Sequence, residues 1–164
     1  MKKLKDLPSH SRVWIYQASK EFTNSELELF ENKSNSFLNQ WTSHGHAMDT
    51  TIEILHKRFV IIAVDEQTAS ASGCGIDKSV RFIQDMEKEL KISLLDRMQV
   101  AYKTGDKVLA CSLQDFEKLY YSKQVDENII VFNNMVSTKA ELVSSWELPL
   151  KNSWQMKKLA LGAN

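Results

Sequence analysis

The stretch Phe59–Ser79, FVIIAVDEQTASASGCGIDKS, decides the fold. Its first six residues form an unbroken apolar run, which is typical of a strand buried on both faces of a sheet. Two acids follow, then a loop of small residues, and then an amphipathic stripe that begins near Ile76 or Asp77. The stretch therefore predicts a central strand that leads through a loop to the N-terminus of a helix.

Strand and helix patterns alternate on both sides of this stretch. A strand pattern over 12–18 precedes a helical stripe that runs to about residue 43, and Thr23 with Glu26 has the spacing of a capping box. Further strand patterns cover 50–55 and 97–102. The order strand, helix, strand, strand, helix, strand is typical of a ferredoxin-like βαββαβ sandwich of the α+β class.

This order sets our expectation for the domain organisation of the chain, which has no internal repeat and no low-complexity linker. We expect a single domain over residues 1–164, with its core at about 11–103. A C-terminal β/α extension at about 104–155 would add to the same sheet, and the tail 156–164 would be frayed.

The composition of the chain limits the kinds of molecule that we expect it to bind. Lys+Arg and Asp+Glu both number 21, so no net charge attracts nucleic acid or an anionic membrane. No apolar run approaches the roughly 20 residues that span a bilayer, and the basic start has no apolar segment behind it. Cys74 and Cys111 form no CxxC pair, so we expect free thiols and a cytoplasmic location. We also expect a monomer or a homodimer.

The expected topology brings two loops to one edge of the sheet. The first helix returns the chain to the end at which the central strand exits, so loop 42–49 should lie near loop 65–75. A small anionic ligand could bind there at the start of the second helix, where backbone N–H groups and the helix dipole favour negative charge. The candidate ligand-binding residues are Ser72, Gly73, Cys74, Gly75, Lys78 and Ser79.

The same edge also allows an enzymatic alternative. A metal could be held by His44 and His46, with oxygen from Asp65 or Glu66 or sulfur from Cys74. Cys74 could instead act as a nucleophile with His44 or His46 as its base. The candidate catalytic residues are therefore His44, Asp65 and Cys74. No strong motif in the sequence requires a cofactor.

Several segments together resemble a family of short bacterial proteins that is often labelled "ABC transporter ATPase". They are RVWIYQ, QWTSHG, FVIIAVDE, SGCGIDKSVRFIQ, DRMQVAYK, IVFNN and WELP followed by SW, and they span about Leu7 to Trp154. The resemblance implies no established activity. A Walker A loop, GxxxxGK[ST], would place its glycines at Ser72 and Asp77, so we predict that the chain is not a P-loop ATPase.

We therefore expect a non-catalytic module that binds a small anionic ligand or a protein partner at Ser72–Ser79. The metal- or thiol-dependent enzyme is the alternative. A structural or assembly protein is a further alternative, and it predicts that Trp146 and Trp154 are buried only in an oligomer.

Overall fold

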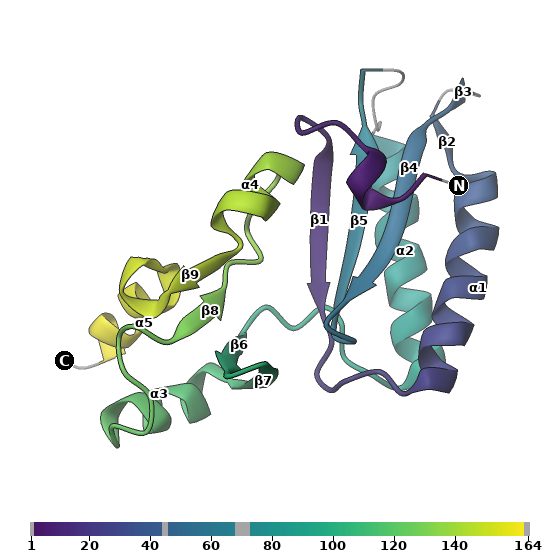
Figure 1. The fold of residues 1–164 in the computed structure, drawn as a ribbon. Helices are drawn as coiled ribbons and strands as arrows, with labels where there is room; N and C mark the ends of the chain where they lie inside the picture. Colours follow the sequence, from purple (N-terminus) through teal and green to yellow (C-terminus); the bar gives the residue numbers. More distant parts are fainter. Residues whose placement is uncertain (1, 44–45, 68–72, 163–164) are drawn as a thin grey trace.

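The structure is a computed structural model that describes residues 2–43, 46–67 and 73–162 (Figure 1). The predicted central strand, β5 (Phe59–Asp65), is the middle strand of a three-stranded antiparallel sheet, between β1 (Arg12–Gln17) and β4 (Asp49–Leu55). Residues 59–64 have no exposed surface. The prediction of a strand buried on both faces is therefore confirmed.

Two long helices cover one face of this first sheet (Figure 1). They are α1 (Asn24–Gln40) and α2 (Gly73–Leu90). The predicted capping box is present: the Thr23 hydroxyl accepts from the Glu26 N–H, and the Glu26 carboxylate accepts from the Thr23 N–H. These bonds satisfy N–H groups that have no partner within the helix.

The ferredoxin-like prediction is wrong at its fourth strand. β6 (Gln99–Thr104) does not join the first sheet but begins a second antiparallel sheet, of order β7-β6-β8-β9. The other strands of the second sheet are β7 (Lys107–Ser112), β8 (Ile130–Phe132) and β9 (Glu147–Pro149). The C-terminal extension therefore builds its own sheet, and the fold is mixed α+β with two sheets.

The edge of β1 that faces away from β5 is occupied, which leaves no place for β6 in the first sheet. The N–H of Val13 donates to the carbonyl of Ser137, and the N–H of Lys139 donates to the carbonyl of Ser11, both at 2.9 Å. A segment from late in the chain thus occupies the edge that the fourth strand of a ferredoxin-like sheet would use. β6 instead pairs with β7 over its whole length, through the turn that contains Gly105.

The two sheets stack face to face between two layers of helix (Figure 1). The face of the first sheet that points away from α1 and α2 shares an apolar cluster with the second sheet, which includes Ile61, Phe59, Ala101 and Phe132. Helices α3 and α5 cover the opposite face of the second sheet. The remaining elements are η1 (Leu4–Asp6), β2 (Thr42–Ser43), β3 (His46–Ala47), α3 (Leu113–Tyr121), α4 (Lys139–Ser145), η2 (Leu150–Asn152) and α5 (Trp154–Gly162).

Residues 156–162 of the predicted tail lie in a helix. α5 extends to Gly162, Leu159 is fully buried, and the Tyr121 hydroxyl donates to the Leu159 carbonyl at 2.7 Å. Trp146 is also buried within the single chain, with 5% of its surface exposed. The prediction that this tryptophan becomes buried only in an oligomer is wrong.

Candidate ligand-binding site

The structure brings the end of α1 and the start of α2 together, as the predicted topology required. The indole N–H of Trp41, directly after α1, donates to the carbonyl of Gly75 at 2.9 Å. Asp49 at the start of β4 pairs with Asp65 at the end of β5. The two loops predicted to share an edge of the first sheet therefore begin and end side by side.

The predicted anion-binding segment is mostly helix. α2 begins at Gly73, three residues before the predicted start, so Lys78 and Ser79 lie in its second turn. Ser79 is buried, and its hydroxyl donates to the Ile76 carbonyl at 2.7 Å, so this side chain already has a partner inside the helix. Lys78 is exposed on the helix surface. A Cβ added at Gly73 would meet nothing within 4 Å, so no close contact requires glycine there.

The metal and thiol hypotheses fall largely on residues outside the described part. His44 and Ser72 lie outside the described residues, and so do the side chains of His46 and Cys74. Among the residues that the structure describes, no group of three or more His, Cys, Asp or Glu side chains is placed to hold a metal. Both hypotheses stay predictions.

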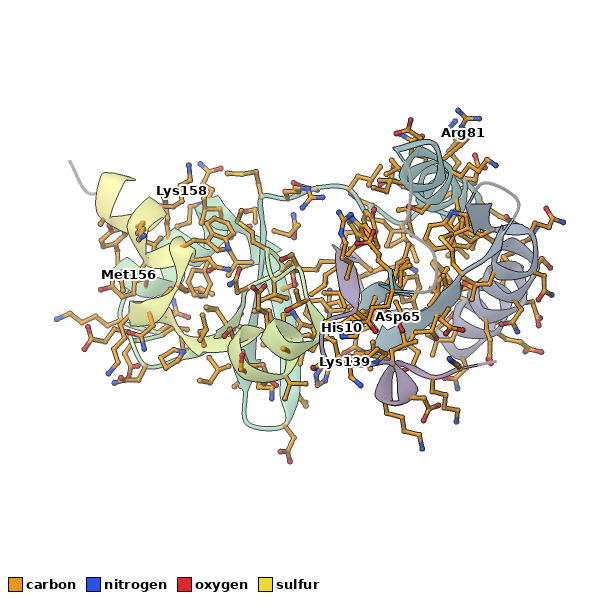
Figure 2. The ribbon with its side chains drawn as sticks, turned by 90° about the horizontal axis from the view of Figure 1, so that it is seen from above. His10, Asp65, Arg81, Lys139, Met156 and Lys158 are labelled. Atoms are coloured by element: carbon orange, nitrogen blue, oxygen red, sulfur yellow. The ribbon has the colours of Figure 1, made fainter. Side chains whose placement is uncertain are left out.

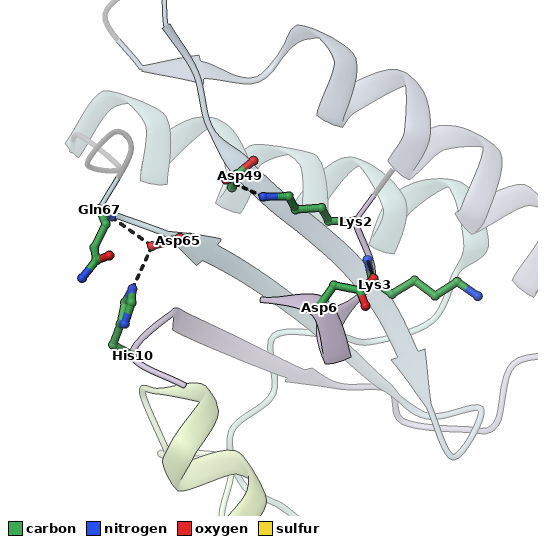
Figure 3. Close-up of polar contacts among 7 residues, drawn as sticks. All are labelled: Lys2, Lys3, Asp6, His10, Asp49, Asp65 and Gln67. Atoms are coloured by element: carbon green, nitrogen blue, oxygen red, sulfur yellow. Dashed lines mark hydrogen bonds and ion pairs between the residues drawn. The ribbon is translucent and has the colours of Figure 1, made fainter. Parts of the chain in front are cut away.

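The side chain of Asp65, the last residue of β5, contacts the N-terminal segment (Figures 2 and 3). One carboxylate oxygen lies 2.9 Å from Nε2 of His10 and accepts the Gln67 N–H at 3.0 Å. The Gln67 N–H, followed by the His10 side chain, holds the pKa of Asp65 below its usual range. The neighbouring Glu66 pairs with Arg12 at 3.2 Å. Among the described residues, Asp65 and Glu66 therefore hold His10 and Arg12, at the start of β1, against the end of β5.

A pocket of about 270 Å³ lies where the two sheets meet, away from the predicted edge. Four segments line it: the end of β1, the connection from α2 to β6, the residues around the end of β8, and α5. Its lining residues include Ile15, Tyr16, Gln17, Leu94, Leu95, Asp96, Arg97, Met98, Gln99, Phe132, Asn134, Met135, Trp154, Gln155 and Lys158. Sequence reasoning missed this pocket because residues far apart in the chain form it.

Three lining residues carry buried polar atoms that have no hydrogen-bond partner in the described part of the chain. They are the Gln17 Nε2, the Trp154 Nε1 and the Gln155 Oε1. Gln17 is 6% exposed and Gln155 is 1% exposed, so bulk water does not solvate these side chains. Because buried polar groups are nearly always hydrogen-bonded, three exceptions around one pocket need an explanation.

The hydrogen bonds of neighbouring groups show which of these three atoms are donors and which are acceptors. The Trp146 indole N–H donates to the Asn134 Oδ1 at 3.0 Å, so the Asn134 NH₂ faces the Gln17 Oε1 and donates to it at 2.8 Å. The unpartnered end of Gln17 is therefore its NH₂ group. The Gln155 NH₂ donates to the Phe132 carbonyl at 3.0 Å, which leaves its oxygen unpartnered. The three atoms together offer two donors and one acceptor.

The rim of the pocket combines apolar and positively charged side chains. Met98 and Met135 are 52% and 72% exposed, although both are large apolar residues. Arg97 and Lys158 are exposed cations. Asp96 is the one acid of the lining, and its carboxylate accepts from the Met98 N–H and the Gln99 side chain. Figure 2 shows Lys158 on α5, at the opposite end of the molecule from Arg81 on α2.

A larger hollow, of about 520 Å³, lies beside the N-terminal segment, α1 and β4. Among its described lining residues, only Ser34 has a buried side-chain atom without a partner. A single hydroxyl gives little basis for recognition. The pocket between the sheets, the junction pocket from here on, is therefore the stronger candidate site.

One sequence signal could have identified part of the junction pocket. Val13, Ile15 and Gln17 alternate along β1, so the polar Gln17 occupies the register of two residues that face the core between the sheets. A glutamine in that register needs a partner or a ligand. No comparable signal marks Gln155, because the tail around it has only weak periodicity.

Comparison with known proteins gives no match: no family model, curated protein or solved structure matches the chain. The resemblance to the short bacterial family therefore stays a prediction. Among the helices in the described part of the chain, none combines the length and the apolar character needed to cross a membrane.

Proposed function

We propose that this chain is a binding module that holds a small organic ligand in the junction pocket. The observation that carries the proposal is the lining of one pocket, which combines apolar side chains, the exposed cations Arg97 and Lys158, and three residues that each keep a buried polar atom without a partner in the described chain: Gln17, Trp154 and Gln155. Leaving a buried polar atom without a partner costs about 1–3 kcal/mol. A ligand supplies the missing partners if these side chains turn toward the cavity when it binds, since the three atoms have almost no accessible surface in the free protein.

The size and lining of the pocket support a small molecule. Its volume of about 270 Å³ is just below the range of about 300–1,000 Å³ that is usual for small-molecule sites. Apolar side chains with a few convergent polar groups are the usual lining of such sites. The cations Arg97 and Lys158 at the rim favour an anionic group on the ligand, in keeping with the predicted anionic ligand but at a different place in the fold.

The lining also favours binding over catalysis. The described lining residues include no Ser, Cys or His, so the pocket offers recognition groups rather than a nucleophile with its base. The predicted site at the start of α2 has less support, because Ser79 is buried and bonded within the helix.

The proposal is tested by protein NMR during a screen of small acids, amides and amines. The resonance of the Trp154 indole N–H is identified by its loss in Trp154→Phe. We expect binders to shift this resonance and the side-chain NH₂ resonances of Gln17. If binders instead shift residues at the start of α2, or if no compound shifts the Trp154 indole, the junction pocket is not the binding site.

Trp154→Phe also separates function from folding. The substitution removes an N–H that has no partner in the described chain, so it breaks no hydrogen bond of the fold. We expect the variant to stay folded and to bind each hit about tenfold more weakly, since a donor to the ligand is lost. Gln114→Leu, on the exposed surface of α3, is the control that should leave binding unchanged.

A further inference from the structure

We infer that the ligand of the junction pocket is a single-chain carboxylic acid, whose apolar chain fills the cavity and whose carboxylate lies at the mouth. This inference rests on the proposed function and names the class of molecule that the pocket binds. The apolar lining favours the chain, and the exposed cations of the lining favour the carboxylate.

More than half of the residues that line the pocket are apolar or aromatic. They come from both sheets, from the connection between α2 and β6, from the segment after β8 and from α5: Ile15, Tyr16, Leu94, Leu95, Met98, Phe132, Met135 and Trp154. An apolar chain that leaves water for such a lining gains free energy in proportion to the apolar area that is buried. A charged group in the same place would lose its hydration. The cavity therefore favours the apolar part of a ligand.

The volume of the pocket limits the length of that chain. At about 270 Å³ the pocket has room for roughly nine groups of the size of a water molecule, each of which takes up ~30 Å³ in the liquid. A methylene group is of similar size, so a single chain of about eight carbon atoms fits the cavity. A lipid with two long chains does not.

Two methionines of the lining present apolar surface to solvent. Met98, in the connection from α2 to β6, is 52% exposed, and Met135, in the segment after β8, is 72% exposed. Methionine is unbranched and polarizable, so it adapts to apolar groups of different shape. A chain that contacts these side chains on its way into the cavity removes their apolar surface from water.

The mouth of the pocket carries more positive than negative charge. Arg97 and Lys158 line the pocket and are also exposed, so their charged ends lie at its mouth. The described residues give no ion pair to either cation. Asp96, the one acid of the described lining, accepts from the Met98 N–H with one oxygen and from the Gln99 side chain with the other. A carboxylate at the mouth thus meets unpaired positive charge while it keeps contact with solvent.

Arg97 is the better placed of the two cations to hold the carboxylate. Tyr16 lines the same pocket and is only 5% exposed. Burial raises the pKa of the Tyr16 hydroxyl, and the Arg97 guanidinium lies near enough to lower it by a smaller amount. The charge of Arg97 therefore lies beside buried lining, where solvent screens an ionic contact less than on an open surface. Lys158, on α5, adds a second positive charge.

The experiment uses the whole protein and two matched series of probes. The first series is butanoate, hexanoate, octanoate and decanoate, which share the carboxylate and differ in the chain. The second series is the corresponding primary alcohols, which keep the chain and lack the charge. Binding is followed through the indole resonance of Trp154, which lines the pocket, and is quantified by calorimetry.

The chain-length dependence tests the apolar part of the ligand. We expect the affinity for the acids to rise about fourfold with each added methylene group as far as octanoate, because each group buries more apolar surface. Beyond octanoate the affinity should level off, because the cavity is filled. An affinity that stays the same from butanoate to octanoate would show that no chain enters the cavity, and the inference would be wrong.

The comparison of acids with alcohols tests the charged part. We expect each acid to bind about tenfold more tightly than the alcohol of the same chain length. Arg97→Gln should remove most of this preference, and Lys158→Gln a smaller part. Arg81→Gln and Lys157→Gln are the matched controls, because both positions are exposed, neither lines the pocket, and each variant loses one positive charge. Both controls should keep the full preference; equal losses in them would mean that the mouth of the pocket does not select the acid.

The outcomes separate the inference from the proposed function. If the alcohols bind at the junction pocket as tightly as the acids, the pocket binds a ligand but the carboxylic acid is the wrong class. If other compounds of the screen shift the Trp154 indole and none of the acids does, the inference is overturned and the proposed function stands. If no compound shifts this resonance at low-millimolar concentration, both fail.

Discussion

The interface between the two sheets has two neighbouring regions of opposite character, the packed end and the junction pocket, and Phe132 belongs to both. At the packed end, the ring centroids of Phe59, Phe132 and Trp146 lie 4.7–4.9 Å apart, and Trp146 is 5% exposed. At the junction pocket, Trp154 lies beside a cavity and its indole N–H has no partner in the described chain. The same residue type therefore belongs to a filled core in one region and lines a hollow in the neighbouring region.

The difference between the two regions shows that the effect of a polar group at the interface depends on whether it has a hydrogen-bond partner. The indole N–H of Trp146 donates to Asn134, whereas the indole N–H of Trp154 donates to no described atom. The first arrangement stabilises the fold. The second lowers stability unless a further group supplies the partner.

The largest effect should come from the packed end. We expect Trp146→Ala to lower the free energy of unfolding by about 3–5 kcal/mol, because it removes a buried aromatic side chain and leaves a cavity. Trp154→Ala is the matched variant at the junction pocket, and we expect it to cost about 1 kcal/mol. Urea unfolding of both variants checks the contrast. Equal losses would mean that the two ends are packed alike.

A smaller loss of stability should come from a change at Asn134, which is hydrogen-bonded both to Trp146 in the packed end and to Gln17 at the junction pocket. Asn134 accepts from Trp146 and donates to Gln17, so Asn134→Ala leaves two groups without a partner. We expect a loss of about 1–3 kcal/mol in urea unfolding. The loss should be smaller in a Trp146→Phe background, where no indole N–H needs an acceptor. Asn39→Ala, on the exposed surface of α1, should change stability little; an equal loss there would argue against the proposed role of Asn134.

The smallest effect on stability should appear only at acidic pH. It comes from Asp65, which lies outside both the packed end and the junction pocket. The pKa of Asp65 in the folded state lies below its ordinary value of 3.8, so its stabilising effect is full above that value. It is lost as the pH falls through the lower folded pKa. Asp65→Asn should therefore flatten the acid limb of a stability–pH curve measured by urea unfolding. The lowered pKa of Glu26 contributes to the same limb and remains in this variant.

The position of Asp65 makes this a test of location. Asp65 lies at the end of β5 opposite Phe59, where His10 and the N-terminal segment meet the sheet (Figure 3). Acid sensitivity should thus be independent of ligand in the junction pocket. An acid limb that disappears when ligand binds, and not in Asp65→Asn, would show that pH acts through the pocket instead.

Local patterns in the sequence were enough for the long elements of the first hundred residues and for one edge of the first sheet. The apolar run at 59–64 predicted the buried central strand, and Thr23 with Glu26 predicted the start of α1. The adjacency of the two loops followed from connectivity and is confirmed by the bond from Trp41 to Gly75. These features depend on residues close in sequence, or on strand direction alone.

The predictions that failed concern pairing over long distances in the chain. Nothing local to 97–102 shows that residues 137–139 will occupy the edge of β1, so the fourth strand was assigned to the wrong sheet. The start of α2 was placed three residues late because Gly73 and Gly75 weaken a helix by propensity, while the contact with Trp41 holds that turn in place.

The sequence by itself determined the α+β class, the central strand, the helix caps and the balanced charge, because each follows from periodicity, from capping chemistry or from composition. Only the tertiary structure decided which strands share a sheet and where the candidate site lies. The physical reason is that the roles of Gln17, Asn134 and Gln155 depend on hydrogen bonds to other elements of the fold, some of which are present and some missing. The bond from Asn134 to Gln17 joins residues 117 positions apart, and no local pattern encodes it.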